Sequence, residues 1–218
     1  MWHVEASSID VLWIGTLTYA AALERQHATH AARVRGLIRD TVLLTEHPPV
    51  VTLGRGSDLD GEIVADATLK SRGIDVVRSG RGGHATYHGP GQLVGYPIVD
   101  LRARGGDVHA YLRLLERVMI AVAQAFGVHA HAREGLTGTW VGERKLGSIG
   151  VQVRRGVSLH GFALNVDMDL SPFELFAPCG MEGLRVTSLA HEIGRSIVMA
   201  DVLPYAERSL RAELDAGR

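Results

Sequence analysis

Apolar side chains recur at helical spacing in three stretches of the chain. The clearest is 107–126, where apolar residues follow one another at intervals of three and four positions, as on one face of a helix. Asp107 stands where an N-cap would, and Gly127 where a helix ends. Residues 18–39 predict an amphipathic helix and 200–216 a weaker one. The positions of 18–39 expected to face a core are Leu23, Ala31, Val34 and Ile38.

Short β-rich segments lie between these helices. Residues 41–45, 50–53 and 74–78 are predicted strands. Residues 145–166 predict a β-hairpin that turns at Arg154-Arg155-Gly156. Strands and helices are therefore mixed without strict β-α-β alternation. This pattern predicts an α/β (α+β) fold, in which a mixed β-sheet is flanked by helices.

Length and composition narrow the possible classes of protein. No repeat or linker divides the 218 residues, so we expect residues 1–218 to form a single domain. With 23 basic and 24 acidic residues the net charge is -1, which predicts neither nucleic-acid nor membrane binding. The longest strictly apolar run, 118–123, is far shorter than the ~20 residues of a membrane-spanning helix. One cysteine excludes an internal disulfide, and the absence of a secretory pattern favours a cytoplasmic protein.

Nucleotide and metal motifs are not supported. Residues 80–85 formally fit the dinucleotide fingerprint, but the Gly-Pro-Gly at 89–91 forbids the helix that the fingerprint must open. The P-loop pattern is missing, and His191-Glu192 lacks the second histidine of a zinc-protease helix. His129 and His131 alternate as on an exposed strand, which usually binds nothing, so we expect no metal.

Residues 81–92, with the sequence RGGHATYHGPGQ, are rich in glycine. Glycine lacks a Cβ, so main-chain N–H groups can approach a ligand closely. The same composition also suits a plain surface loop. Tyr87 and His88 favour a ligand site, because a polar-tipped aromatic ring and an imidazole can orient a carbonyl group.

Cys179 lies between Pro178 and Gly180, which leave its sulfur accessible. A lone cysteine is more often a small buried residue than a nucleophile, and a thiol with the ordinary pKa of about 8.5 needs a nearby cation to act as a nucleophile. Lys145 is the candidate cation, because it is one of only two lysines in an arginine-rich chain and an ammonium can release a proton. A solvated lysine at a strand end is the alternative.

Three long segments, in this order, resemble the lipoyl(octanoyl) transferase family. They are 81–98 (RGGHATYHGPGQLVGYPI), 145–166 (KLGSIG…GVSLHGFALNV) and 176–189 (FAPCGMEGLRVTSL). Weaker similarity at 46–49 and 52–55 extends the resemblance over most of the chain. It implies the fold of the biotin- and lipoate-protein ligase catalytic domains.

The resemblance implies an acyltransferase of lipoate biosynthesis and protein lipoylation. Family members move an octanoyl group from octanoyl-acyl carrier protein to a lysine of lipoyl domains, here those of 2-oxoacid dehydrogenase complexes and the glycine cleavage H protein. Exchange between thioesters is nearly isoenergetic and the final amide is stable, so we expect no ATP and no other cofactor. The alternatives are an ATP-dependent lipoate- or biotin-protein ligase, which would not need Cys179, and a non-catalytic acyl-binding module.

The resemblance also assigns roles to residues. It implies that Cys179 carries the acyl thioester and that Lys145, at the lysine of a K-x-x-S-x-G motif, activates it. The implied substrate-binding residues are Arg81, Gly82, Gly83, His84, Ala85, Thr86, Tyr87, His88, Ser148, Ile149, Gly150, Gly161, Phe162 and Ala163. Bare backbone at 147–150 is expected to supply donors to tetrahedral oxyanions. His84 occupies a position that varies in the family, and Gly147 replaces a common alanine, which is expected to loosen the Lys145 strand or widen the pocket.

Two groups of arginines are candidates for docking an acidic carrier protein. They are Arg33, Arg35 and Arg39, and Arg144, Arg154 and Arg155. Any single one of these groups is more often a solvated face than a docking site.

Overall fold

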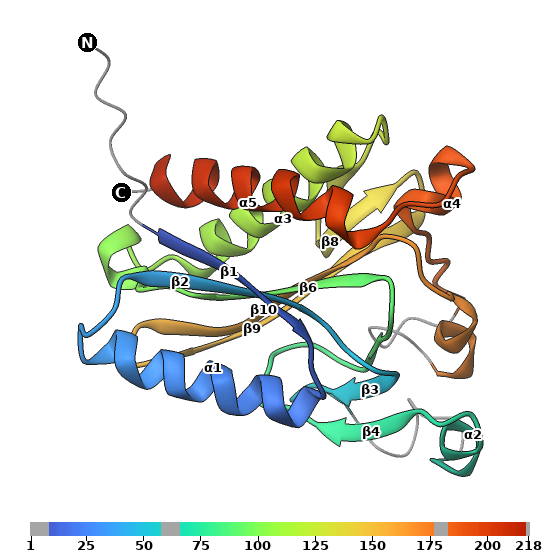
Figure 1. Cartoon of the computed structure of the whole chain (residues 1–218), viewed down its shortest axis with the longest axis horizontal. Coiled ribbons are helices and arrows are strands. Elements are labelled where there is room, and N and C mark those ends of the chain that lie inside the picture. Colours follow the sequence, from blue (N-terminus) through green and yellow to red (C-terminus); the bar gives the residue numbers. More distant parts are fainter. Residues whose placement is uncertain (1–8, 58–65, 177–182, 217–218) are drawn as a thin grey trace.

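A seven-stranded mixed sheet forms the centre of the molecule (Figure 1). The computed structural model describes residues 9–57, 66–176 and 183–216. The strands, in spatial order, are β1 (Ile9–Thr16), β2 (Asp40–Glu46), β6 (Gln92–Ile98), β10 (Val157–Asn165), β9 (Arg144–Arg154), β8 (Leu136–Val141) and β7 (His131–Arg133). Strands β1 and β2 are parallel and the other neighbours antiparallel, which confirms the predicted mixed sheet.

A smaller sheet and two helical layers complete the fold. The small sheet has the order β4 (Asp75–Arg78), β3 (Val50–Leu53), β5 (Thr86–His88). Helix α1 (Tyr19–Val34) covers one face of the large sheet, and α3 (Val108–Ala125) and α5 (Met199–Ala216) cover the other (Figure 1). The short helices are α2 (Asp66–Ser71), α4 (Leu189–Ile193) and the 3-10 turns Leu101–Arg104 and Ser171–Leu175. No helix in the described ranges is long and apolar enough to cross a membrane.

Helix α3 begins and ends as its sequence predicts. The side chain of Asp107 accepts hydrogen bonds from the N–H groups of His109 and Ala110, at 2.8 and 3.2 Å, and so caps the helix. Gly127 follows the helix with a φ of +78°, a left-handed conformation that suits glycine. Val108, the first apolar residue of the helical pattern, does not face the core, since it is 37% exposed.

Strands β9 and β10 form the predicted hairpin. Arg154 pairs with Val157, so the loop consists of Arg155 and Gly156 alone. Both residues have positive φ, +51° and +76°, as a two-residue type I′ turn requires. The hairpin is long enough to carry several predicted site residues into the centre of the sheet.

Helix α1 corrects part of the prediction for 18–39. Ala31, which was expected to face the core, is exposed. The helix instead buries Tyr19 and the polar Gln26. The side-chain oxygen of Gln26 accepts a hydrogen bond from the N–H of His160 in β10 at 3.0 Å, whereas its Nε2 has no hydrogen-bond partner among the described residues.

Candidate active site

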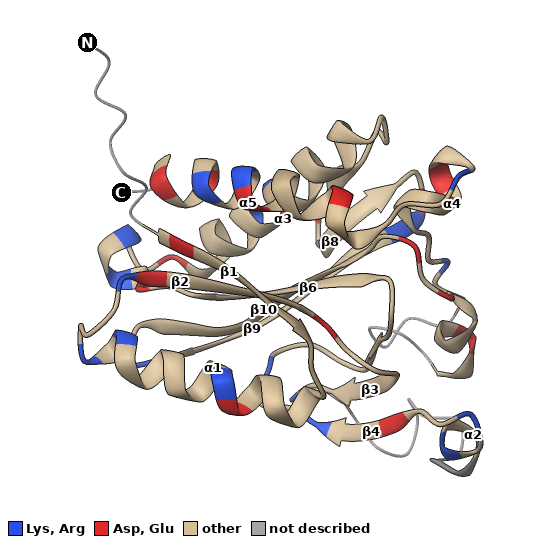
Figure 2. Cartoon of the chain, in the orientation of Figure 1, with Lys and Arg blue, Asp and Glu red and all other residues tan. Residues whose placement is uncertain are grey.

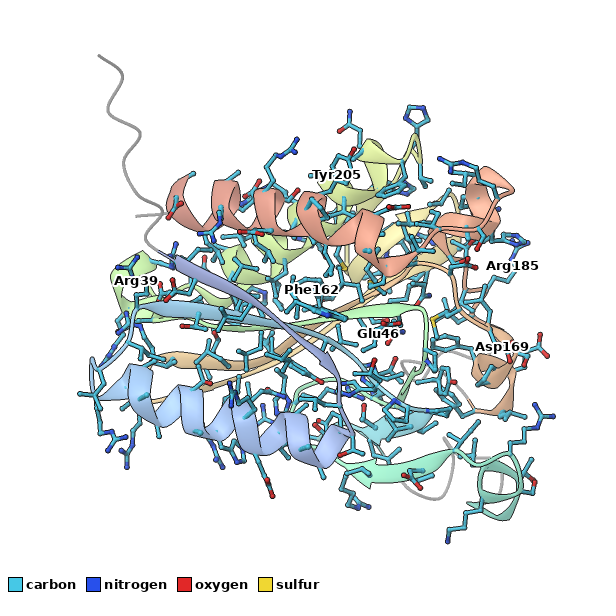
Figure 3. The ribbon with its side chains drawn as sticks, in the orientation of Figure 1. Arg39, Glu46, Phe162, Asp169, Arg185 and Tyr205 are labelled. Atoms are coloured by element: carbon cyan, nitrogen blue, oxygen red, sulfur yellow. The ribbon has the colours of Figure 1, made fainter. Side chains whose placement is uncertain are left out.

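A cavity of about 210 Å³ lies on the side of the sheet that α1 covers. Tyr19 at the start of α1, the residues around Arg81 and parts of β6, β8, β9 and β10 contribute to its walls. Phe162, on β10 at the cavity border, lies in the middle of the molecule (Figure 3). Of the residues implied to bind substrate, all except Gly82 and Tyr87 line this one cavity. Segments distant in the sequence are therefore brought together as the family resemblance implies.

Hydrogen bonds to two strands of the large sheet hold the glycine-rich segment in place. The N–H of Gly82 donates to the Val151 carbonyl of β9 at 2.9 Å. At the other end, the N–H of Gly91 donates to the Glu46 side chain of β2 at 2.7 Å, and Glu46 is marked in Figure 3. The segment predicted as irregular also contains strand β5. It is therefore a fixed wall of the cavity.

Tyr87 and His88 point to opposite sides of β5, as adjacent strand residues do. The Tyr87 ring packs edge-on against Phe173, with centroids 5.6 Å apart, in the core of the small sheet. The Tyr87 ring therefore does not border this cavity. His88 does line the cavity, and its Nδ1 lies 2.7 Å from Gln92 Oε1. Burial lowers the pKa of His88 to about 3, so the imidazole is neutral.

Neutral aromatic rings form one wall of the cavity. Tyr19, His88 and Tyr96 border the space, and the His47 ring lies against all three. His47 Nδ1 donates to the Leu17 carbonyl at 2.6 Å, which leaves Nε2 to accept from the Tyr96 hydroxyl at 2.7 Å. Burial raises the pKa of Tyr96 well above 10 and lowers that of His47. These side chains can therefore contact an apolar chain without presenting a charge.

Arg81 supplies a buried positive charge beside the same space. Its Nη2 donates to the Thr52 carbonyl at 2.6 Å, and its Nε to the Thr52 hydroxyl at 3.2 Å. Its side chain crosses Gly150, where a Cβ would lie 2.9 Å from Arg81 Cδ. A glycine at this position of β9 thus leaves room for the guanidinium.

Lys145, at the start of β9, borders the cavity and is only 6% exposed. Its N–H donates to the Arg185 carbonyl and its carbonyl accepts from the Thr187 N–H, both at 2.9 Å. The chain that follows residues 177–182 is therefore fixed to the backbone of Lys145. Cys179 itself lies outside the described residues.

The Lys145 side chain passes over Gly138 of β8 and ends 5.3 Å from the centre of the Trp140 ring. A Cβ on Gly138 would lie 2.9 Å from Lys145 Cε, and the φ of Gly138 is +129°. The N–H of Gly138 donates to a carboxylate oxygen of Glu116 at 2.9 Å. Glu116 is a buried residue of α3, on the far side of the sheet. It fixes the strand against which the lysine rests.

Gly147 does not widen the cavity as predicted. A Cβ at this position would approach Met119 Sδ of α3 to 2.5 Å, and Gly147 is not among the residues that border the cavity. The missing methyl group therefore leaves room on the α3 side of the sheet. Since a methionine sulfur is at the far end of a flexible chain, an alanine here is accommodated by movement of Met119.

No group of three histidine, cysteine, aspartate or glutamate side chains within the described ranges is placed to hold a metal ion. His131 lies at the start of strand β7 and is exposed, as its alternation with His129 predicted.

A family model described as "Lipoyl protein ligase A/B catalytic domain" matches residues 18–211. The chain belongs to this family. It is 48% identical over 189 residues to an "Octanoyltransferase" of Geobacter metallireducens, and the match covers 87% of this chain and 85% of that protein. The chain is therefore an enzyme, an acyltransferase, as predicted.

Solved structures confirm the predicted fold. A putative lipoate protein ligase from T. acidophilum with bound lipoic acid has a TM-score of 0.71 at 18% identity, covering 94% of this chain and 85% of that one. A lipoate-protein ligase A bound with ATP has a TM-score of 0.73 at 17% identity, covering 96% and 86%. At these identities the likeness concerns the fold alone.

Three buried polar atoms at the cavity lack partners within the described ranges, and two of them, on Trp140 and His160, belong to residues that the sequence did not indicate. Thr86 Oγ1, Trp140 Nε1 and His160 Nδ1 belong to residues that border it and have no hydrogen-bond partner among the described residues. Burial, with the charge of Arg81, lowers the pKa of His160 to about 4. Buried polar groups normally have partners, so a bound molecule or water can use these atoms. Only the rarity of tryptophan, three in the chain, could have drawn attention to Trp140.

Proposed function

We propose that this enzyme transfers an octanoyl group from octanoyl-acyl carrier protein to the acceptor lysine of lipoyl domains, through a thioester on Cys179. The observation that carries the proposal is the position of Lys145. Its side chain borders the cavity, while its backbone holds the Arg185 and Thr187 segment that follows Cys179 in the sequence. Lys145 therefore provides a cation at the cavity through its side chain and, through its backbone, holds the segment that follows Cys179.

In the first half of the proposed reaction, the Cys179 thiolate attacks the carbonyl carbon of the donor thioester. A carbon–sulfur bond to Cys179 forms, the bond to the carrier sulfur breaks, and the carrier thiolate takes up a proton. The Lys145 ammonium stabilises the attacking thiolate and can donate that proton. Main-chain N–H groups at 147–150 are the proposed donors to the tetrahedral oxyanion.

In the second half, the uncharged amine of the acceptor lysine attacks the acyl-enzyme. An amide bond forms, the Cys179 thiolate leaves, and the proton of the amine passes to a base, for which neutral Lys145 is the candidate. Because both steps start from a thioester, the reaction needs no ATP. The two protein substrates react in turn with one thiol, so ping-pong kinetics are expected.

The side chains that line the cavity are suited to bind an apolar acyl chain. Tyr19, Tyr96 and the neutral His88 surround it on one side, and Val94 and Ala163 add aliphatic surface from the sheet. Burial of a methylene group in such a site contributes about 0.8 kcal/mol. The substrate-binding roles of the residues named above are proposed on this basis. A free, reactive thiol is compatible with the reducing cytoplasm, which is the proposed compartment.

The test is transfer to a lipoyl domain with and without ATP. We expect octanoyl-acyl carrier protein to give an octanoylated lysine in the absence of ATP. A product formed only from free octanoate and ATP would assign the chain to the ligase reaction. No amide product under either condition would favour a non-catalytic acyl-binding module.

A further inference from the structure

Ion pairs divide the two predicted arginine groups into occupied and available members. The occupied members form the ion pairs Arg33–Asp40, Arg39–Asp10 and Arg144–Glu192. Arg35, Arg154 and Arg155 form no ion pair with any described residue. Half of the members of the predicted docking groups therefore already neutralise carboxylates of the same chain.

The three available arginines meet in one groove. Arg35 follows the last residue of α1, and Arg154 and Arg155 lie at the tip of the β9–β10 hairpin. The groove has a volume of about 750 Å³, and none of the aspartates and glutamates that the structure describes lines it. Figure 2 shows Lys and Arg positions gathered where α1 leads into β2.

The remaining lining of the groove combines imidazole and aliphatic groups. His27 and His30 of α1 add polar rings, and His30 Nε2 lies 3.1 Å from the Arg154 carbonyl, which ties the helix to the hairpin. Val34 and Leu159 form part of an apolar floor. A basic rim over an apolar floor is complementary to an acidic, amphipathic protein helix.

The groove and the cavity lie along the same seam between α1 and β10. Tyr19 borders the cavity and Val34 the groove, and at 1.5 Å per residue they are about 22 Å apart along the helix. Between them, Gln26 accepts a hydrogen bond from the N–H of His160. His160 borders the cavity, while the preceding residue, Leu159, borders the groove.

The distance from the groove to Lys145 distinguishes the two protein substrates, because Arg154 and Lys145 lie nine residues apart on β9, about 30 Å at 3.3 Å per residue. A lysine side chain is short, so the body of an acceptor domain must lie directly at the cavity. A carrier protein presents its thioester on a long flexible arm, so its body can dock at a distance. We propose that this groove binds the acidic face of the acyl carrier protein that delivers the octanoyl thioester, an inference that rests on the proposed function.

The experiment reverses the charge of two available arginines and follows acylation of the enzyme. In the double variant Arg35→Glu/Arg154→Glu, the KM for octanoyl-acyl carrier protein should rise about tenfold at low salt, because electrostatic docking is lost. The KM for octanoyl-N-acetylcysteamine, a donor without a protein body, should stay unchanged. The difference between variant and wild type should shrink as salt is added, because salt screens exposed charges.

The matched control is Arg72→Glu/Arg78→Glu, which makes the same change in net charge at two exposed arginines outside the groove. If both double variants raise the KM for the carrier equally, the effect is one of net charge and the groove proposal fails. An unchanged carrier KM, or a raised KM for the lipoyl domain alone, also overturns it. Failure of the proposed function is distinguishable, because the wild type would then accept an octanoyl group from neither donor.

Discussion

Replacing Ala163 by leucine should shorten the acyl chain that the enzyme prefers. Ala163 is 3% exposed and borders the cavity. On the sheet it lies between Val94 of β6 and Ser148 of β9, which also border the cavity. A leucine at this position adds the volume of roughly three methylene groups, and that volume is taken from the space proposed for the acyl chain.

The size of the effect follows from the buried methylenes. If each contributes about 0.8 kcal/mol, loss of three costs about 2.4 kcal/mol, or about 60-fold in kcat/KM for an octanoyl donor. A five-carbon chain still fits in the reduced space. Its kcat/KM should therefore remain close to the wild-type value, and the optimum should move from eight carbons to about five.

The assay is kcat/KM for acyl-carrier donors of four to sixteen carbons. The wild type should favour eight carbons over four and sixteen, because a closed pocket rewards each methylene only until it is full. Ala121→Leu, at an exposed position of α3, is the control for the side-chain change itself. An unchanged eight-carbon optimum with unchanged kcat/KM, in an Ala163→Leu protein that melts normally, would show that the acyl chain binds elsewhere.

Three other perturbations test the polar parts of the site. Lys145→Ala should raise the pH midpoint of Cys179 alkylation by iodoacetamide, because the charge that stabilises the thiolate is lost. Lys145→Arg should keep a low midpoint but lose turnover, since a guanidinium cannot release a proton. Equal midpoints in the wild type and in Lys145→Ala would show that the two residues are not coupled. Glu116→Ala should lower kcat about tenfold, because the hydrogen bond to the Gly138 N–H is lost. Glu116→Gln keeps an oxygen acceptor and should retain most of the wild-type kcat. Full activity of Glu116→Ala would refute the positioning role. His88 and His160 have pKa values of about 3 and about 4 in the folded protein, below the ordinary 6.5, so the unfolded chain binds more protons and stability falls as the pH drops below 6.5. Each of the two histidines should lower the free energy of unfolding by about 2 kcal/mol between pH 7.5 and pH 5. Equal free energies of unfolding, measured with urea at the two pH values, would contradict this.

Elements whose ends are encoded locally could be predicted from the sequence. Asp107 and Gly127 bracket an apolar helical pattern, and both act at the ends of α3 as predicted. The tight turn of the hairpin likewise needs positive φ at Arg155 and Gly156, and nothing outside the hairpin is required to form it.

Strand β6 was not predicted from the sequence, because it contains a proline whose place in the sheet depends on a contact with a residue distant in the sequence. Pro97 lies in this central strand although it has no N–H for the ladder. The ladder between β6 and β10 ends at the pair Gly95 and Phe162, and the Pro97 carbonyl accepts from the Ser158 hydroxyl at 2.7 Å. No local pattern in the sequence predicts that a serine 61 residues away donates the hydrogen bond to the Pro97 carbonyl.

The same limit applies to the site. Glycine spacing and the family resemblance indicated one side of the cavity. The bond between Glu116 and Gly138 and the buried Gln26 have no local signal, because each depends on a partner from another element. Strand alternation would have separated Tyr87 from His88, but β5 was read as part of an irregular loop, so both were assigned to the ligand.

The central claim is that Cys179 carries the octanoyl group. Its most direct test is the intact mass of the protein after incubation with octanoyl-acyl carrier protein without ATP or acceptor. The mechanism predicts one octanoyl adduct that hydroxylamine removes and that a folded Cys179→Ala variant does not form. A wild-type protein that transfers the octanoyl group without ever showing this adduct, or a Cys179→Ala variant that still turns over, would contradict it.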